Sequence, residues 1–186
     1  MDNIAVKRFL SFFQPANNLV KANSEVINKY EKILPSEIIS LWKKYGFGNY
    51  GEGVLKIVDP TLYKKNLDKW LNIASDDNIP FMINAFGDIY YIKRLTETMY
   101  EINLLSITYR KYKYCASSIS EFFTNYITEP SVIGTDLNAR IYLYAEESVG
   151  RLDNNSIYTF NPIGSEDVKN IKIEDAITYQ NKIYGE

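Results

Sequence analysis

The chain of 186 residues contains 21 Lys and Arg side chains against 23 Asp and Glu, so its formal net charge is only −2. Hydrophobic residues at 46% and charged residues at 24% exclude a disordered or collagenous polypeptide, and a chain of this length can bury a core without disulfides or metals. His is absent and Cys115 is the only cysteine. The composition therefore excludes Ser-His and Cys-His nucleophile pairs, His-containing metal sites, Cys-based zinc sites and an internal disulfide.

The first quarter of the chain is predicted to be helical. Residues 9–13 form an apolar stretch that is too short for a signal peptide core or a membrane span. A short helix is expected after Ser24. A second helix is expected because apolar residues recur at i, i+3, i+4 and i+7 from Ile38 to Tyr45, and Gly46 stands where a left-handed C-terminal cap belongs.

A strand and a third helix are predicted next. Residues 54–58 are typical of a strand. Asp59 and Pro60 predict the start of a helix, because the Asp side chain can accept from an unpaired backbone N–H and proline lacks an N–H that would need a partner. The apolar residues of this helix, expected to face the core, are Leu62, Tyr63, Leu67 and Trp70.

The middle of the chain is predicted to be rich in strands. Residues 81–85 and 89–92 are expected to pair through a hairpin turn at Phe86-Gly87-Asp88. Two further strands, rich in Tyr, Ile and Thr, are expected at residues 99–103 and 105–115.

The last part of the chain mixes helices and strands. Ser118 and Glu121 form a capping box for a helix that Pro130 ends, and residues 131–138 are predicted to be a turn-rich boundary. A helix over 137–148, strands at 157–160 and near 171–173, and a final helix to Tyr184 are expected to follow. This order is neither strict βαβ alternation nor a meander, so the predicted class is α+β with a mostly antiparallel sheet packed with helices.

Two local patterns imitate ligand-binding motifs. Gly46-Phe47-Gly48-Asn49-Tyr50-Gly51 matches the dinucleotide fingerprint, but a helix precedes it and a strand follows, which is the inverse of the required context. Arg110-Lys111-Tyr112-Lys113-Tyr114 alternates basic and aromatic residues as single-strand binders do. Strand alternation places the lysines and tyrosines on opposite faces, so an ordinary half-buried strand is the preferred interpretation.

Acidic residues are concentrated near the C-terminus. Residues 131–186 hold five basic and nine acidic side chains, a net charge of −4, whereas a nucleic-acid binder normally shows the opposite sign. Adjacent carboxylates such as Asp76-Asp77 and Glu174-Asp175 diverge on a helix or strand and are expected to be solvated. For Asp88, a turn or capping role is preferred to catalysis.

Several motifs in order resemble the GAD-like domain family. The match is strongest over residues 23–103. Its motifs are Tyr30-Glu31 to Leu34-Pro35, Leu41-Trp42-Lys43-Lys44-Tyr45-Gly46-Phe47-Gly48, Gly51-x-Gly53, Val58-Asp59-Pro60, Tyr63 and Ala85-Phe86-Gly87-Asp88-Ile89-Tyr90-Tyr91. Farther on, Gly150-x-Leu152 and Ile157-Tyr158-x-Phe160-x-Pro162 are similar to the module that commonly follows this domain in type VI secretion immunity proteins against DNase toxins.

The resemblance implies a non-catalytic immunity protein that binds and neutralises a cognate secreted toxin, a nuclease being the expected kind, in the cytoplasm of the producing cell. It also implies two contiguous lobes in one compact unit: an N-terminal extension at 1–22, a GAD-like lobe at 23–104 and an immunity-protein-like lobe at 105–186. No metal, cofactor, membrane or direct nucleic-acid partner is expected.

Two sets of residues are assigned on this basis. A nuclease needs a basic cleft, so carboxylates of the acidic last third are the predicted partner-binding residues: Glu146, Glu147, Asp153, Glu166 and Asp167. The motif residues are predicted to maintain the fold rather than to touch the partner: Trp42, Tyr45, Gly46, Pro60, Trp70 and Gly87. Two other functions stay open, a regulatory module that senses a small ligand or nucleic acid, and a carboxylate-dependent hydrolase.

Overall fold

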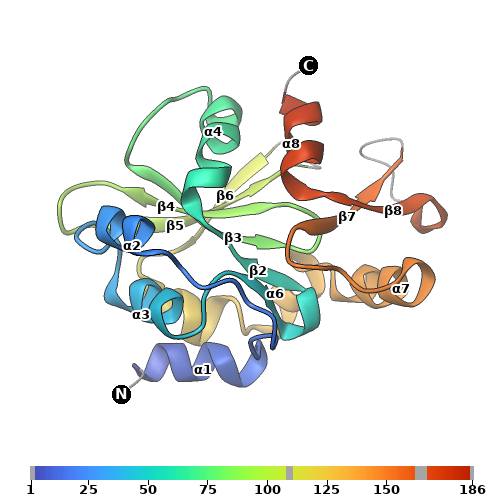
Figure 1. The fold of residues 1–186 in the computed structure, drawn as a ribbon, viewed down its shortest axis with the longest axis horizontal. Coiled ribbons are helices and arrows are strands. Elements are labelled where there is room, and N and C mark those ends of the chain that lie inside the picture. Colours follow the sequence, from blue (N-terminus) through green and yellow to red (C-terminus); the bar gives the residue numbers. More distant parts are fainter. Residues whose placement is uncertain (1–2, 108–110, 162–166, 185–186) are drawn as a thin grey trace.

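A six-stranded antiparallel sheet forms the centre of the computed structural model, which describes residues 3–107, 111–161 and 167–184 (Figure 1). Each strand pairs with its neighbour in chain order. The strands are β1 (Gly48–Tyr50), β2 (Leu55–Ile57), β3 (Asn78–Asn84), β4 (Ile89–Arg94), β5 (Tyr100–Ser106) and β6 (Lys111–Ala116). A second, two-stranded antiparallel sheet joins β7 (Ser156–Phe160) to β8 (Ile171–Asp175). The structure confirms the α+β class.

Helices cover both faces of the large sheet (Figure 1). On one face lie α1 (Ile4–Phe12), α3 (Ser36–Lys44) and α5 (Ile119–Glu121), the last continuing into the π-helical segment η2 (Phe122–Tyr126). On the other face lie α4 (Pro60–Leu71) and α8 (Ala176–Tyr184). The remaining elements are α2 (Ser24–Tyr30), the 3₁₀ turn η1 (Gly51–Gly53), α6 (Pro130–Thr135), α7 (Ala139–Val149) and the 3₁₀ turn η3 (Val168–Asn170).

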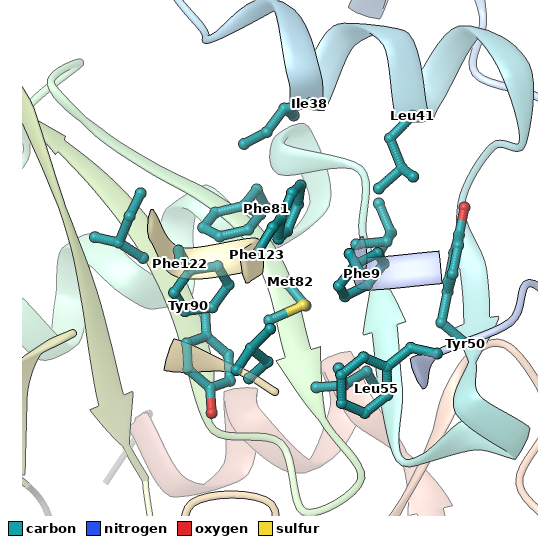
Figure 2. Close-up of a cluster of buried hydrophobic side chains, with 14 of the residues drawn as sticks. Phe9, Ile38, Leu41, Tyr50, Leu55, Phe81, Met82, Tyr90, Phe122 and Phe123 are labelled. Atoms are coloured by element: carbon teal, nitrogen blue, oxygen red, sulfur yellow. The ribbon is translucent and has the colours of Figure 1, made fainter. Parts of the chain in front are cut away.

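The larger core lies under α1, α3 and η2 and is rich in aromatic rings (Figure 2). Phe9 of α1 stacks on Phe123 of η2 with ring centroids 4.6 Å apart. Phe122 packs edge-on against Phe81 of β3 and Tyr90 of β4. Burying one such side chain stabilises the fold by roughly 1.5–3 kcal/mol. The predicted extension at 1–22, the lobe at 23–104 and the lobe at 105–186 therefore contribute side chains to one apolar core.

The second core lies between the sheet and helices α4 and α8. Leu67 of α4 and Ile83 of β3 are both fully buried there. A polar contact crosses it: the buried Gln180 side chain donates to the backbone oxygen of Gly87, 3.0 Å away, and accepts from the Asn66 side chain. These bonds matter for stability, because a buried polar group without a partner in such a core would be costly.

The local signals for helix ends are confirmed. Gly46 has φ of +100°, and a Cβ there would lie 2.3 Å from the Val20 carbonyl oxygen, so the position requires glycine. The Asp59 carboxylate accepts from the Thr61 N–H at 2.8 Å, and Pro60 follows as the first residue of α4. Asp88 closes the turn between β3 and β4, where its N–H donates to the Asn84 side-chain oxygen at 3.0 Å.

Three predictions are corrected. Residues 131–138 are not a boundary: Pro130 starts helix α6, which Val132 and the following Leu137 anchor in the core. The break between the strands predicted at 99–103 and 105–115 is misplaced: β5 runs through Leu104 and Leu105, which are both buried, to Ser106, and β6 begins at Lys111. Leu62 is 61% exposed, since the buried stripe of α4 runs through neighbouring positions about 100° away around the helix.

The interpretation of residues 111–114 as a half-buried strand is also wrong. The two tyrosines do share one face of the strand, where Tyr112 lies opposite Leu105 and Tyr114 opposite Asn103. Both rings nevertheless face solvent, with 72% and 56% of their surface exposed. The cause is position: β6 is an edge strand, and α4 and α8 cover the central strands (Figure 1). The lobe division after residue 104 stays a prediction; that position lies within β5.

Candidate functional site

A cleft of about 970 Å³ opens where the N-terminal segment meets the last third of the chain. Its walls come from the end of α1 and the segment after it (residues 11–18), from β1 and η1, from α6 and α7, and from Arg151 and Leu152. Three separate stretches of the chain, residues 11–18, 49–54 and 133–152, meet here, so the cleft exists only in the folded protein.

A buried lysine supports the floor of this cleft. Lys56 of β2 has no exposed surface, and its ammonium donates to the Asp153 backbone oxygen at 3.0 Å and to the Asn49 side chain. Asn49 lines the cleft and donates from its side chain to the Leu152 oxygen at 2.9 Å. Asn154 accepts from the Asn49 backbone N–H at 2.9 Å. The network binds residues 152–154 to strands β1 and β2.

Burial sets the charge state of this network. Desolvation lowers the pKa of Lys56 to about 7, against a smaller opposing effect of the Asp153 carboxylate. Hydrogen bonds from Asn155 and Ser156 lower the pKa of Asp153. Because Lys56 is inaccessible, it positions the 152–154 loop and has no surface with which to meet a ligand.

Helix α7 forms the outer wall of the cleft. The Tyr142 hydroxyl donates to the Glu52 backbone oxygen at 2.7 Å and fixes the helix to η1. Leu143 lines the cleft and is 63% exposed. Arg151 pairs with Glu146 of α7 at 3.0 Å, and the Arg151 side chain is 76% exposed. The wall therefore offers one apolar side chain beside a charged pair.

The predicted partner-binding carboxylates are spread over three segments. Glu146 and Glu147 lie on α7, where Glu146 is half-buried against Arg151 and Glu147 is exposed. The exposed Asp153 holds a turn by accepting from the N–H groups of Asn155 and Ser156, both at 2.8 Å. Asp167 caps η3, which packs beside α7. Glu166 lies outside the described residues.

The predicted scaffold residues differ in burial. Trp42 is 1% exposed and packs edge-on against Tyr30 and Phe47, whereas Trp70 and Tyr45 are half-buried. A Cβ on Gly87 would lie 2.8 Å from Ile157 Cδ1. Gly46 and Pro60 occupy the helix ends described above. The assignment of a purely structural role to the six residues stays a prediction.

Reasoning from sequence missed the Lys56 network. A signal was present, because Lys56 is the single charged residue in the apolar run from Val54 to Val58. A lysine in a central strand must find partners, since an unpaired buried charge is costly. Its partners at residues 49 and 153, however, could not be read from the sequence.

Within residues 3–107, 111–161 and 167–184, His, Cys, Asp and Glu side chains form no group of three that could hold a metal ion. In the same ranges, the helices are all too short or too polar to cross a membrane.

Comparisons with known proteins define the family. The GAD-like domain matches residues 5–106, which is more than half of the chain. The fold is similar to the crystal structure of Atu4351 from Agrobacterium tumefaciens, with a TM-score of 0.73 and 17% sequence identity over 96% of this chain and 87% of that one. At this identity the similarity concerns the fold alone. A search of curated proteins gives no match. On the strength of the domain match, the chain belongs to the GAD-like domain family.

Proposed function

We propose that the protein is a non-catalytic immunity protein that binds a cognate secreted toxin of the nuclease class in the cytoplasm of the producing cell. Family membership and the motifs at 150–152 and 157–162 support this proposal. The observation that carries it is the surface of α7 beside the 970 Å³ cleft.

This surface combines an apolar contact with negative charge. Leu143 is 63% exposed, and the exposed Glu147 stands one helical turn after it on the same side of α7. Covering an exposed apolar side chain with a protein partner removes it from water, which favours binding. The carboxylate beside it complements a basic surface.

Charge gives the proposed partner its class. Residues 131–186 carry a net charge of −4, and a nuclease must expose basic side chains to hold DNA phosphates. In the proposed complex, the carboxylates of α7 face the phosphate-binding groove of the toxin, and Leu143 anchors the contact. The inhibitor thereby blocks DNA binding and takes part in no chemical step.

The test measures association with the toxin encoded by the neighbouring gene, at low and at high salt. The variant Glu146→Lys with Glu147→Lys is compared with Glu25→Lys with Glu97→Lys. The control pair makes the same change in net charge on α2 and on the β4–β5 turn, away from α7 (Figure 1). The α7 variant is expected to associate about tenfold more slowly or worse at low salt, because rim charges act mainly on the association rate.

Two results would count against the proposal. One is an equal loss in both double variants, which would reflect net charge rather than the α7 surface. The other is a neighbouring toxin that fails to bind the wild-type protein at any salt concentration.

A further inference from the structure

A second cavity lies between the end of α2 and the outer face of α4. Its volume is about 660 Å³, within the range of small-molecule sites. Its lining includes four lysines and a single carboxylate, Asp68. The lysines are Lys29, Lys64, Lys65 and Lys69. We call this cavity the basic groove.

The single carboxylate does not neutralise the groove. Asp68 pairs with Lys64 one helical turn before it, and both side chains are about one-fifth exposed. Lys29, Lys65 and Lys69 are exposed, and within the described residues no ion pair joins them to a carboxylate. Three positive charges therefore converge on the cavity of a protein whose net charge is negative.

The spacing of these charges favours a ligand with more than one anionic group. Lys65 and Lys69 stand one turn apart on α4, which places their Cβ atoms about 5–6 Å apart. Lys29 approaches from α2, on the other side of the groove. A single small anion cannot contact all three ammonium groups as well as a chain of linked phosphates can.

Part of the lining of the groove is apolar. Ile73 is 58% exposed and lines the groove beside Ala74. Tyr30 supplies a buried aromatic wall, and the Lys29 ammonium lies over its ring, 5.3 Å from the centroid. An organic group attached to the phosphates can rest against the exposed Ile73 side chain.

We propose that the basic groove binds a small molecule that carries two or more linked phosphates, either inorganic or borne by a nucleoside. A long nucleic acid is disfavoured, because the remainder of the chain is acidic and the groove is only as large as a small ligand. The groove shares no lining residue with the α7 cleft, so this proposal is independent of toxin binding.

Two other carboxylates interact electrostatically with Tyr30, which lines the groove. Asp59 and Asp76 raise the pKa of Tyr30, although burial is the larger cause. Asp59 is engaged as the cap of α4, where it accepts from the Thr61 N–H and hydroxyl. Asp76 is exposed, and its charge opposes an anionic ligand. The variant Asp76→Asn is therefore expected to bind such a ligand severalfold more tightly.

The experiment is titration calorimetry on the full chain with sodium tripolyphosphate and, separately, with ATP in the absence of divalent cations. One ligand per protein is expected, with weaker binding at higher salt. Lys65→Gln with Lys69→Gln is expected to weaken binding about tenfold or more. The control Lys111→Gln with Lys172→Gln removes two exposed lysines of β6 and β8 and is expected to change affinity less than twofold.

The two ligands distinguish the source of the phosphates. Equal affinity for tripolyphosphate and ATP would show that the groove recognises the phosphate chain alone. Tighter binding of ATP would show that the nucleoside also contacts the apolar part of the lining. The proposal is overturned if neither ligand binds at millimolar concentration, if both double variants weaken binding equally, or if single-stranded DNA binds where neither small ligand does.

Discussion

The ammonium of Lys56 donates a hydrogen bond to the backbone oxygen of Asp153, 3.0 Å away and 97 positions later in the chain. This hydrogen bond joins strand β2, within the region that matches the GAD-like domain, to the loop that follows α7. The loop also contributes Leu152 to the cleft, so the position of the cleft wall depends on the buried amine of Lys56.

This buried amine predicts a pH-dependent stability. Lys56 has a pKa of about 7 in the fold and an ordinary value of 10.5 when unfolded, so between these values the unfolded chain binds more protons. The contribution of Lys56 to the free energy of unfolding must then rise with pH, by up to about 1.4 kcal/mol per pH unit. Below pH 7 both states are protonated, and its contribution is constant.

Urea unfolding of the wild type and Lys56→Met at pH 6, 7.5 and 9 tests this expectation. The wild type should gain stability relative to the variant as the pH rises from 7.5 to 9. Parallel pH profiles for the two proteins would contradict the low pKa.

Glycine substitutions should separate a required backbone conformation from a tolerant one. Gly46→Ala should destabilise the protein by about 1–3 kcal/mol or more, because φ is +100° and the new Cβ would meet the Val20 carbonyl oxygen. Gly134→Ala, on helix α6, meets nothing within 4 Å and should be neutral or stabilising by up to about 1 kcal/mol. Thermal unfolding of both variants is the measurement, and a similar loss in each would show that φ is not the cause.

The two tryptophans should differ in their contribution to stability. Trp42→Ala removes a side chain that is 1% exposed and should cost about 3–5 kcal/mol. Trp70→Ala should cost clearly less, since Trp70 is half-buried. Denaturant unfolding measures both losses. If Trp42→Ala kept wild-type stability and lost toxin binding, Trp42 would be a contact residue instead of a scaffold residue.

Asp88 should matter for stability and not for catalysis. Its carboxylate accepts from the Ile107 N–H at 2.8 Å and from the Asn84 side chain at 3.0 Å, both buried. Asp88→Ala removes the partner of the Ile107 N–H and should cost about 1–3 kcal/mol, whereas the Asn84 amide keeps its bond to the Asp136 backbone oxygen. Assays of DNA, RNA and ester cleavage should give no activity for wild type or variant, and an activity that Asp88→Ala abolished would reverse this assignment.

Leu143 should separate binding from folding. Because it is 63% exposed, Leu143→Ala should change the free energy of unfolding by less than about 0.5 kcal/mol. If the side chain anchors the toxin, the dissociation constant should rise about tenfold or more. Leu62→Ala, which removes a leucine of 61% exposure on α4, is the matched control for loss of exposed apolar surface.

The sequence by itself determined the features that depend on near neighbours. The start of α4 follows from Asp59 and Pro60, and the end of α3 follows from Gly46, because each signal acts through a hydrogen bond or a φ angle within a few residues. The α+β class followed from the order of such elements.

Only the tertiary structure decided which side chains meet and which remain exposed. The exposure of Tyr112 results from the position of β6 at the edge of the sheet, and the partners of Lys56 lie across the fold. On α7, the fold half-buries Glu146 against Arg151 and leaves Glu147 in solvent, although the two are adjacent in sequence. Pairing and the final degree of burial depend on contacts between distant segments, and the spacing of residues along one segment does not specify which segments meet.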